Sequence, residues 1–227
     1  MKPYYQDDAV TIYHGDCREM LLELPKVDLV LTDPPYGTGG RDGSTHRTGT
    51  TGDYLSYDAF VWATKQDSNL LFKATREGTH AYVFSDWRRY KDVQIAYEVS
   101  GWELRALIVW AKGNGMGEYW RSSHEFILFF TKRKPRKLEH GNCMNVIHEK
   151  KVAPTKRHHP LEKPIRLIQQ LVVASSKDGE IILDPFMGSG STLVAAKDLN
   201  RKAIGVEIEE KYCEIAATRM MQEVLSL

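Results

Sequence analysis

Short apolar runs alternate along this chain with stretches of helical periodicity, and this alternation constrains the fold more than any other feature. The runs have the length and the β-branched content of buried strands, and they cover 27–32, 79–85, 180–185 and 202–207. The stretches with an apolar stripe at helical spacing cover 58–76, 86–99, 161–176, 191–200 and 209–225. Because strands followed by helices build βα units, the sequence predicts an α/β fold with a mainly parallel sheet and helices on both faces.

Two more apolar runs, 102–111 and 125–130, enclose a glycine-rich linker and predict an antiparallel pair at one edge of the sheet. The length of 227 residues suits a single domain over 1–227. No apolar run approaches the roughly 18 residues that a membrane span needs, and the first residues lack the apolar core of a secretion signal. The three cysteines are odd in number and far apart, so we expect no disulfide framework, a cytoplasmic location and no membrane partner.

Two segments fit neither kind of element. Residues 37–57 are polar and glycine-rich, which predicts a mobile loop. The formal net charge of the chain is only +1, yet residues 132–166 contain eleven Lys or Arg against three Asp or Glu. A basic insertion at 132–157 therefore suits a polyanionic partner, although a solvated surface face explains the charge equally well.

A glycine turn between a strand and a helix forms the first motif that carries chemistry. In EIILDPFMGSGSTLVAA, the strand ends at Asp184, and a turn with Gly188 and Gly190 leads into a helix at about Thr192. Glycines let a ligand approach the backbone, and the helix N-terminus offers unpaired N–H groups. Glu207 ends the next strand, where a carboxylate can accept hydrogen bonds from both hydroxyls of a ribose. The pattern favours a nucleoside cofactor, although an isolated G-x-G is about as often purely structural.

The second motif, VDLVLTDPPYGTGG, is a strand that ends in Asp33-Pro34-Pro35-Tyr36. Two successive prolines fix the backbone and withhold both N–H groups, so the turn presents oxygen acceptors without local donors. A carboxylate beside a proline carbonyl suits the two hydrogens of a planar amino group, and the tyrosine ring offers a face for stacking a heterocycle. A proline turn that merely ends a strand is the structural alternative.

These motifs together resemble those of a known family. DPPY at 33–36, DPFMGSGST at 184–192, VEIEEKYCEIAATRM at 206–220 and HHPLEKPIRLIQQLV at 158–172 are similar to blocks of the S-adenosylmethionine-dependent DNA amino-methyltransferases, which modify adenine N6 or cytosine N4. The catalytic motif comes first, as in the permuted beta arrangement of that family. The resemblance implies a Rossmann-like methyltransferase fold, S-adenosyl-L-methionine as cofactor and double-stranded DNA as substrate, with the target base flipped out of the helix. It leaves open a homodimer and a cognate restriction endonuclease.

The resemblance also implies roles for individual residues. Those at the target amino group are Asp33, Pro34, Pro35 and Tyr36. Those around the cofactor are Phe186, Gly188 and Gly190 in its wall, Asp184 near the methionine amino group, Glu207 on the ribose, Asp16 near the adenine, and Lys163 or Thr192 at the methionine carboxylate. The candidate DNA contacts are Arg41 and Arg47 in the loop at 37–57, and Lys132, Arg133 and Lys134 in the basic insertion.

Within the family, Asp-Pro-Pro-Tyr is usual for adenine and Ser-Pro-Pro-Tyr for cytosine, so Asp33 favours adenine N6 and leaves cytosine N4 as the alternative. Methylation of RNA or of a protein glutamine is less favoured, because Asn is more typical there. A nucleic-acid-binding module without activity is disfavoured because both motifs are intact. No proline is followed by cysteine, so the nucleophile used for methylation of cytosine carbon 5 is absent.

Overall fold

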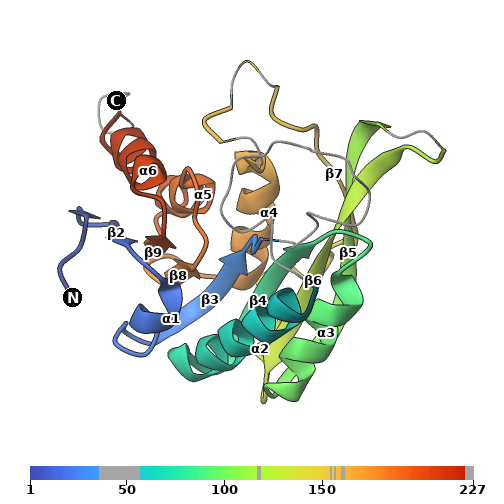
Figure 1. Ribbon diagram of the computed structural model, residues 1–227, viewed down its shortest axis with the longest axis horizontal. Coiled ribbons are helices and arrows are strands. Elements are labelled where there is room, and N and C mark those ends of the chain that lie inside the picture. The colour runs from blue at the N-terminus through green and yellow to red at the C-terminus, as the bar shows by residue number, and fades with distance from the viewer. Residues whose placement is uncertain (36–56, 117–118, 154, 156, 160–161, 223–227) are drawn as a thin grey trace.

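The computed structural model describes residues 1–35, 57–116, 119–153, 155, 157–159 and 162–222 (Figure 1). The helices in these ranges are α1 Cys17–Met20, α2 Tyr57–Ala74, α3 Tyr90–Val99, α4 Ile165–Ser175, α5 Ser191–Asp198 and α6 Glu210–Gln222. The strands are β1 Tyr5–Gln6, β2 Val10–His14, β3 Val27–Thr32, β4 Thr75–Ser85, β5 Trp102–Met116, β6 Ser122–Lys132, β7 Val146–His148, β8 Ile181–Asp184 and β9 Lys202–Glu207.

All of these strands belong to one mixed sheet, in the order β1-β2-β9-β8-β3-β4-β6-β5-β7. Neighbours from β2 to β4 are parallel, and β6 is antiparallel to both β4 and β5. The predicted α/β fold with a mainly parallel sheet is therefore confirmed. The predicted antiparallel pair is present but does not form the edge, because β7 pairs in parallel with the outer side of β5. A strand of three residues carries too little periodicity to be found from sequence.

Side chains of the central strand β3 alternate between two cores, one on each face of the sheet. Leu29 and Leu31 pack in the core that includes residues of α4, α5 and α6, while Val30 packs in the core that includes residues of α1, α2 and α3. All three β3 side chains are at most 1% exposed. The result is a sheet between two helical layers, as Figure 1 shows.

The helices differ from the predicted ranges mainly at their ends. The predicted helix 58–76 ends instead at Ala74, and β4 starts at once, four residues before the predicted strand. The predicted helix 161–176 begins instead after Pro164, whose extended backbone, with ψ of 131°, precedes the first helical residue. These shifts leave the order of elements unchanged.

Strand direction decides which end of the sheet carries the motifs. The parallel strands β3, β8 and β9 end together at Thr32, Asp184 and Glu207, and we call this side the carboxyl end of the sheet. In open α/β sheets this is the end at which ligands bind. Both sequence motifs follow these strands, so the fold brings them to the same place.

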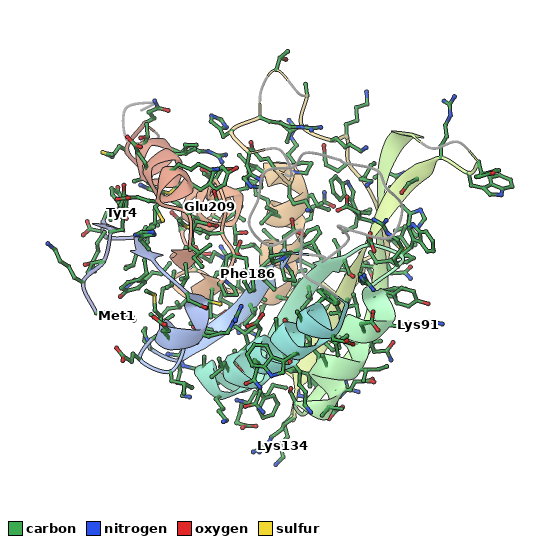
Figure 2. The ribbon with its side chains drawn as sticks, in the orientation of Figure 1. Met1, Tyr4, Lys91, Lys134, Phe186 and Glu209 are labelled. Atoms are coloured by element: carbon green, nitrogen blue, oxygen red, sulfur yellow. The ribbon has the colours of Figure 1, made fainter. Side chains whose placement is uncertain are left out.

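The basic residues at 132–134 lie at the opposite end. In the antiparallel pairing of β6 with β4, Thr131 faces His80, so β6 ends near the start of β4. The Lys132 side chain is 6% exposed, and its ammonium donates hydrogen bonds to the carbonyls of Phe72 and Thr75. Figure 2 shows Lys134 at the lower end of the molecule, away from Phe186, which lines the cavity described below. DNA contacts by Lys132, Arg133 and Lys134 stay a prediction that this placement does not favour, since one charge is used inside the fold and the other two lie at the end of the sheet away from the motifs.

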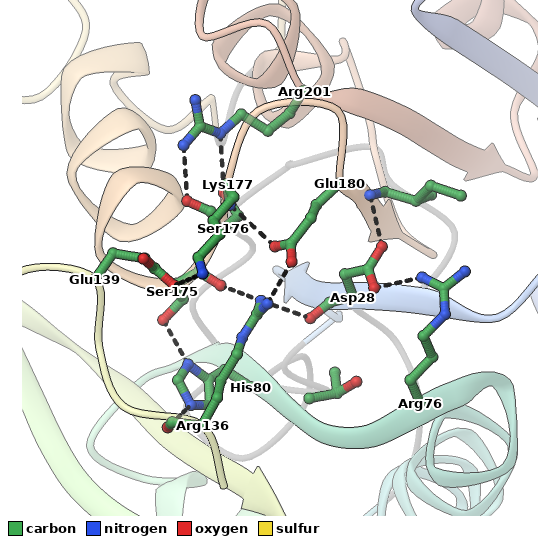
Figure 3. Close-up of polar contacts among 12 residues, drawn as sticks. Asp28, Arg76, His80, Arg136, Glu139, Ser175, Ser176, Lys177, Glu180 and Arg201 are labelled. Carbon is green, nitrogen blue, oxygen red and sulfur yellow. Dashed lines mark hydrogen bonds and ion pairs between the residues drawn. The ribbon is translucent and has the colours of Figure 1, made fainter.

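Another basic residue of this segment also has a structural use. Arg136 donates to the carboxylate of Glu180 at 2.6 Å and to the main-chain carbonyls of Asp28 and Ser175 (Figure 3). His80 accompanies it, with one ring nitrogen 2.8 Å from the Ser175 hydroxyl. These contacts fasten the chain after β6 to the starts of β3 and β8. Two of the four cationic residues at 132–136, the first part of the basic insertion predicted at 132–157, thus hold the fold together, namely Lys132 and Arg136.

Among the described residues, no helix combines the length and the apolar character that crossing a bilayer requires. Cys17, Cys143 and Cys213 are free. Tyr36, Arg41 and Arg47, and with them nearly all of the loop predicted at 37–57, lie outside the described residues.

Candidate active site

A cavity of about 290 Å³ opens at the carboxyl end of the sheet. Its wall combines both sequence motifs, although they are about 150 residues apart in the chain. The predicted site residues in this wall are Asp16, Asp33, Pro34, Pro35, Lys163, Asp184, Phe186, Gly188, Thr192 and Glu207. The structure thus brings together the predicted target-amine residues of β3 and the predicted cofactor residues of β8 and β9.

The two glycines of the turn after β8 both need a left-handed backbone, with φ of 51° at Gly188 and 82° at Gly190. Gly190 faces α6, and Gly188 faces the cavity. A Cβ on Gly190 would lie 2.9 Å from the Cβ of Ala216 in α6, whereas a Cβ on Gly188 would meet only the His159 ring, at 3.9 Å. Gly190 therefore permits close packing of the turn on α6, and Gly188 keeps the cavity wall open. The prediction that Gly190 lines the site is corrected accordingly.

Asp184 ends β8 with a buried side chain, 4% of the residue being exposed. Burial raises the pKa of its carboxyl to about 7, against the opposing effect of hydrogen bonds from the Thr192 hydroxyl and the Phe186 N–H. The Thr192 bond is 2.6 Å long, so this hydroxyl proton is given to Asp184. The predicted role of Thr192 at a cofactor carboxylate does not fit this arrangement, because a carboxylate requires a donor.

Glu207 ends β9, and both of its carboxylate oxygens are fixed by the backbone. Oε2 accepts from the Gly188 N–H at 3.0 Å, and Oε1 accepts from the Glu209 N–H at 2.8 Å. Burial raises the pKa of this carboxyl, and the backbone donors oppose that rise. Each oxygen keeps a lone pair beyond these bonds, so Glu207 can accept from a diol in the cavity.

Asp16 contributes to the cavity from the turn after β2. Its Oδ1 accepts from the Arg18 N–H at 2.9 Å, which makes it the N-cap of α1. Arg18 in turn donates to Asp67 in α2 at 3.1 Å. Asp16 is thus both a helix cap and part of the cavity wall.

Directly after β3, Asp33, Pro34 and Pro35 also line the cavity. Lys163, which precedes α4, forms an ion pair with Asp33 Oδ2. In this structure Lys163 thus contacts the target-amine motif, and its predicted association with a cofactor carboxylate stays a prediction. The two residues are 130 positions apart, so no local sequence signal reveals the pair.

Two residues that the sequence reasoning did not select support the glycine turn. Arg219 of α6 is 9% exposed and donates to the main-chain carbonyl of Ser189 at 2.7 Å. The same guanidinium pairs with Glu162 at 3.2 Å. Because Ser189 lies between the two glycines, this buried arginine fixes the turn to the segment that carries Lys163. Both residues lie within the stretches that carried the family resemblance, and only the lack of an assigned role hid them.

The cavity therefore combines a carboxylate for a cationic group, a carboxylate for a diol, and an acceptor-only turn for an amino group. A nucleoside carrying an amino acid fits the first two features, and a planar exocyclic amine fits the third. This set of acceptors is compatible with S-adenosylmethionine beside an aminopurine or aminopyrimidine.

Known proteins agree with this interpretation. The model of the N6/N4 DNA methylase family matches residues 27–218. Among curated relatives, the type II methyltransferase M2.DpnII of Streptococcus pneumoniae is 29% identical over 252 residues, covering 98% of this chain and 93% of the relative. The type II methyltransferase M.HinfI of Haemophilus influenzae is 28% identical, covering 98% of this chain and 71% of the relative.

Solved structures give the same result for the fold. The complex of M1.HpyAVI with SAM has a TM-score of 0.73 and 25% identity, covering 93% of this chain and 98% of that one. The cytosine-N4-specific PvuII DNA methyltransferase has a TM-score of 0.81 with 18% identity, covering 96% of this chain and 88% of that one, and shows the fold alone. This chain belongs to the N6/N4 DNA methyltransferase family.

Proposed function

We propose that this DNA methyltransferase transfers a methyl group from S-adenosylmethionine to N6 of adenine within duplex DNA. The observation that carries the proposal is Asp33 at the end of β3, in the same cavity wall as Asp184 and Glu207. A carboxylate at this position, in place of the serine usual for cytosine enzymes, favours adenine as the target.

The residues present fit S-adenosylmethionine. Gly188 leaves the wall open, Asp184 offers a buried carboxylate to the cofactor's ammonium group, and Glu207 offers preorganised oxygens to its ribose. Phe186 and Asp16 line the same cavity, where they would border the adenine ring. When bound, the cofactor supplies an electrophilic methyl group on its sulfonium.

The target amine needs activation because its lone pair is conjugated with the ring. Asp33 and the Pro34 carbonyl would accept its two hydrogens, which favours a pyramidal nitrogen with its lone pair directed at the methyl group. The target nitrogen would bond to the methyl carbon as the carbon–sulfur bond breaks with its electron pair going to sulfur, and the proton released by the amine would pass through the Asp33 carboxylate to solvent. Positioning and fixed charges provide the catalysis, without a covalent enzyme intermediate. Since N6 lies inside the duplex, the base must be flipped out, and Tyr36 remains the predicted stacking partner.

The carboxyl end of the sheet also suggests where duplex DNA lies. The hairpin of β5 and β6 projects from this end in Figure 1, and its tip carries Tyr119 and Trp120, which are 90% and 97% exposed. β7 runs parallel to β5, so the exposed Lys150 and Lys151 that follow it also lie on this side. We therefore assign the phosphate contacts to this second half of the basic segment and the contacts with bases or sugars to the aromatic tip.

The direct test uses purified protein, labelled S-adenosylmethionine and unmodified duplex DNA of mixed sequence. After digestion to nucleosides, the label should appear in N6-methyldeoxyadenosine. Label in N4-methyldeoxycytidine would show that the target is cytosine N4 and not adenine N6. In parallel reactions with RNA or protein as substrate, label there and none on DNA would contradict the proposal. The homodimer and the cognate endonuclease stay predictions.

A further inference from the structure

The ammonium group of Lys163 lies in the cavity wall between the carboxylates of Asp33 and Glu125. Its ammonium pairs with Asp33 and lies 3.6 Å from Glu125 Oε2, while the ring centre of Phe84 lies 5.1 Å away. The Lys163 side chain is only 9% exposed. Burial disfavours the charge, but Asp33 and Glu125 outweigh that effect and raise the pKa of Lys163. The lysine is therefore an ammonium at any working pH.

Glu125 is held in turn from its other side. Its Oε1 accepts from Lys112 at 2.7 Å, and the Lys112 side chain is only 8% exposed. Burial opposes the charge on Glu125, and the two lysines outweigh it and lower the pKa of its carboxyl. Four groups of alternating charge thus run in series, from Lys112 on β5 through Glu125 on β6 and Lys163 to Asp33, which directly follows β3. This series connects the hairpin of β5 and β6 with the turn that begins at Asp33.

We propose that Lys163, held by Glu125, is a positioning residue that orients the Asp33 carboxylate toward the target amino group. The inference rests on the proposed role of Asp33 in methyl transfer. An aspartate at the end of a strand can rotate about its side-chain bonds, and a charge-assisted contact at Oδ2 restricts that rotation. Misplacement by about 1 Å can cost about 100-fold in rate, so a partner that fixes the acceptor geometry matters for catalysis.

This role makes a prediction opposite to that of a cofactor ligand. If Lys163 bound the methionine carboxylate, its removal would weaken the affinity for S-adenosylmethionine. A residue that acts through Asp33 changes the rate of transfer instead and leaves cofactor affinity nearly unchanged. The two roles are therefore separated by measuring both quantities on the same variant.

The experiment compares Lys163→Met with Lys163→Arg in single-turnover methylation of duplex DNA, and measures the Kd of S-adenosylmethionine by calorimetry. Lys163→Met should lower the transfer rate by about 10- to 100-fold, with little change in the Kd of S-adenosylmethionine. Loss of residues that orient metal ligands costs a similar factor in activity. Lys163→Arg keeps the charge and should recover part of the rate. A matched control is Lys197→Met, which removes a lysine paired with Asp7 at 2.7 Å outside the cavity and should leave the rate unchanged.

A double-mutant cycle with Asp33→Asn tests whether the effect passes through Asp33. In the Asp33→Asn background, Lys163→Met should cost little further rate. Additive losses, or a large increase in Kd with the rate preserved, would overturn the proposal. Should Lys163→Met fail to fold, Glu125→Gln serves instead, and it should slow transfer without weakening cofactor binding. Turnover by the wild type in the same assay reports separately on the proposed function.

Discussion

The glycine turn after β8 offers a prediction whose magnitude follows from the structure. Gly190 has φ of 82°, and a Cβ on it would lie 2.9 Å from the Cβ of Ala216. A left-handed backbone costs an L-residue about 1–2 kcal/mol, and overpacking a filled core costs about 1–3 kcal/mol. Gly190→Ala should therefore lower the free energy of unfolding by about 2–5 kcal/mol, the sum of these two costs.

Gly188→Ala is the matched comparison two residues away. Its φ is 51°, but a Cβ there would have no neighbour closer than 3.9 Å, so only the backbone cost of about 1–2 kcal/mol applies. Because Gly188 lines the cavity, its substitution should instead weaken the binding of S-adenosylmethionine, and Gly188→Val should do so more strongly. Gly141, whose Cβ would meet nothing within 4 Å, provides a neutral control.

Urea unfolding measures the first quantity and calorimetry with S-adenosylmethionine measures the second. The expected result is a crossed pattern, in which Gly190→Ala mainly loses stability and Gly188→Ala mainly loses cofactor affinity. Equal losses of stability at the two glycines, or a larger loss at Gly188, would refute the assignment of the two sides of the turn.

Three further predictions concern charged residues. Asp33→Ala should slow methyl transfer by about 100-fold or more while the Kd of S-adenosylmethionine is preserved, since the residue is assigned to the target amine; near-normal turnover would contradict this. Burial raises the pKa of Asp184 from 3.8 to about 7 in the folded protein, so the folded state binds a proton that the unfolded chain has released. The free energy of unfolding of the cofactor-free protein, measured in urea, should therefore fall as pH rises between these values, and Asp184→Asn should show a smaller decrease. Replacing both Lys150 and Lys151 by alanine should flatten the slope of log DNA affinity against log salt concentration by about 0.9 for each phosphate that is no longer neutralised. Replacing Arg133 and Lys134 by alanine should leave this slope unchanged. The same slope for both double variants would contradict the assignment of the phosphate contacts.

The parts of the fold that follow from local pattern were predictable. The apolar runs at 27–32, 180–185 and 202–207 correspond to β3, β8 and β9. Both motifs follow these strands, so their shared place at the carboxyl end of the sheet follows from the parallel arrangement. β2 was not predicted, because its place depends on pairing with β9 near the other end of the chain, and that pairing leaves no local signal.

The use of individual charges was less predictable. Lys132 belongs to a basic run in the sequence, yet the antiparallel course of β6 buries it against carbonyls where α2 ends and β4 begins. Lys163 was assigned from family resemblance, and its ion pair with Asp33 depends on the packing of segments 130 residues apart. Composition gives the number of charges, whereas only the fold decides which of them face a partner.

The central claim, methylation of adenine N6 in DNA through Asp33, is tested most directly by sequencing that detects modified bases in cells expressing this protein. Cells with the wild-type chain should carry N6-methyladenine at one recurring sequence context, and cells with Asp33→Ala at equal protein level should carry none above background. Modified cytosine in place of adenine, or equal adenine methylation with Asp33→Ala, would contradict the account.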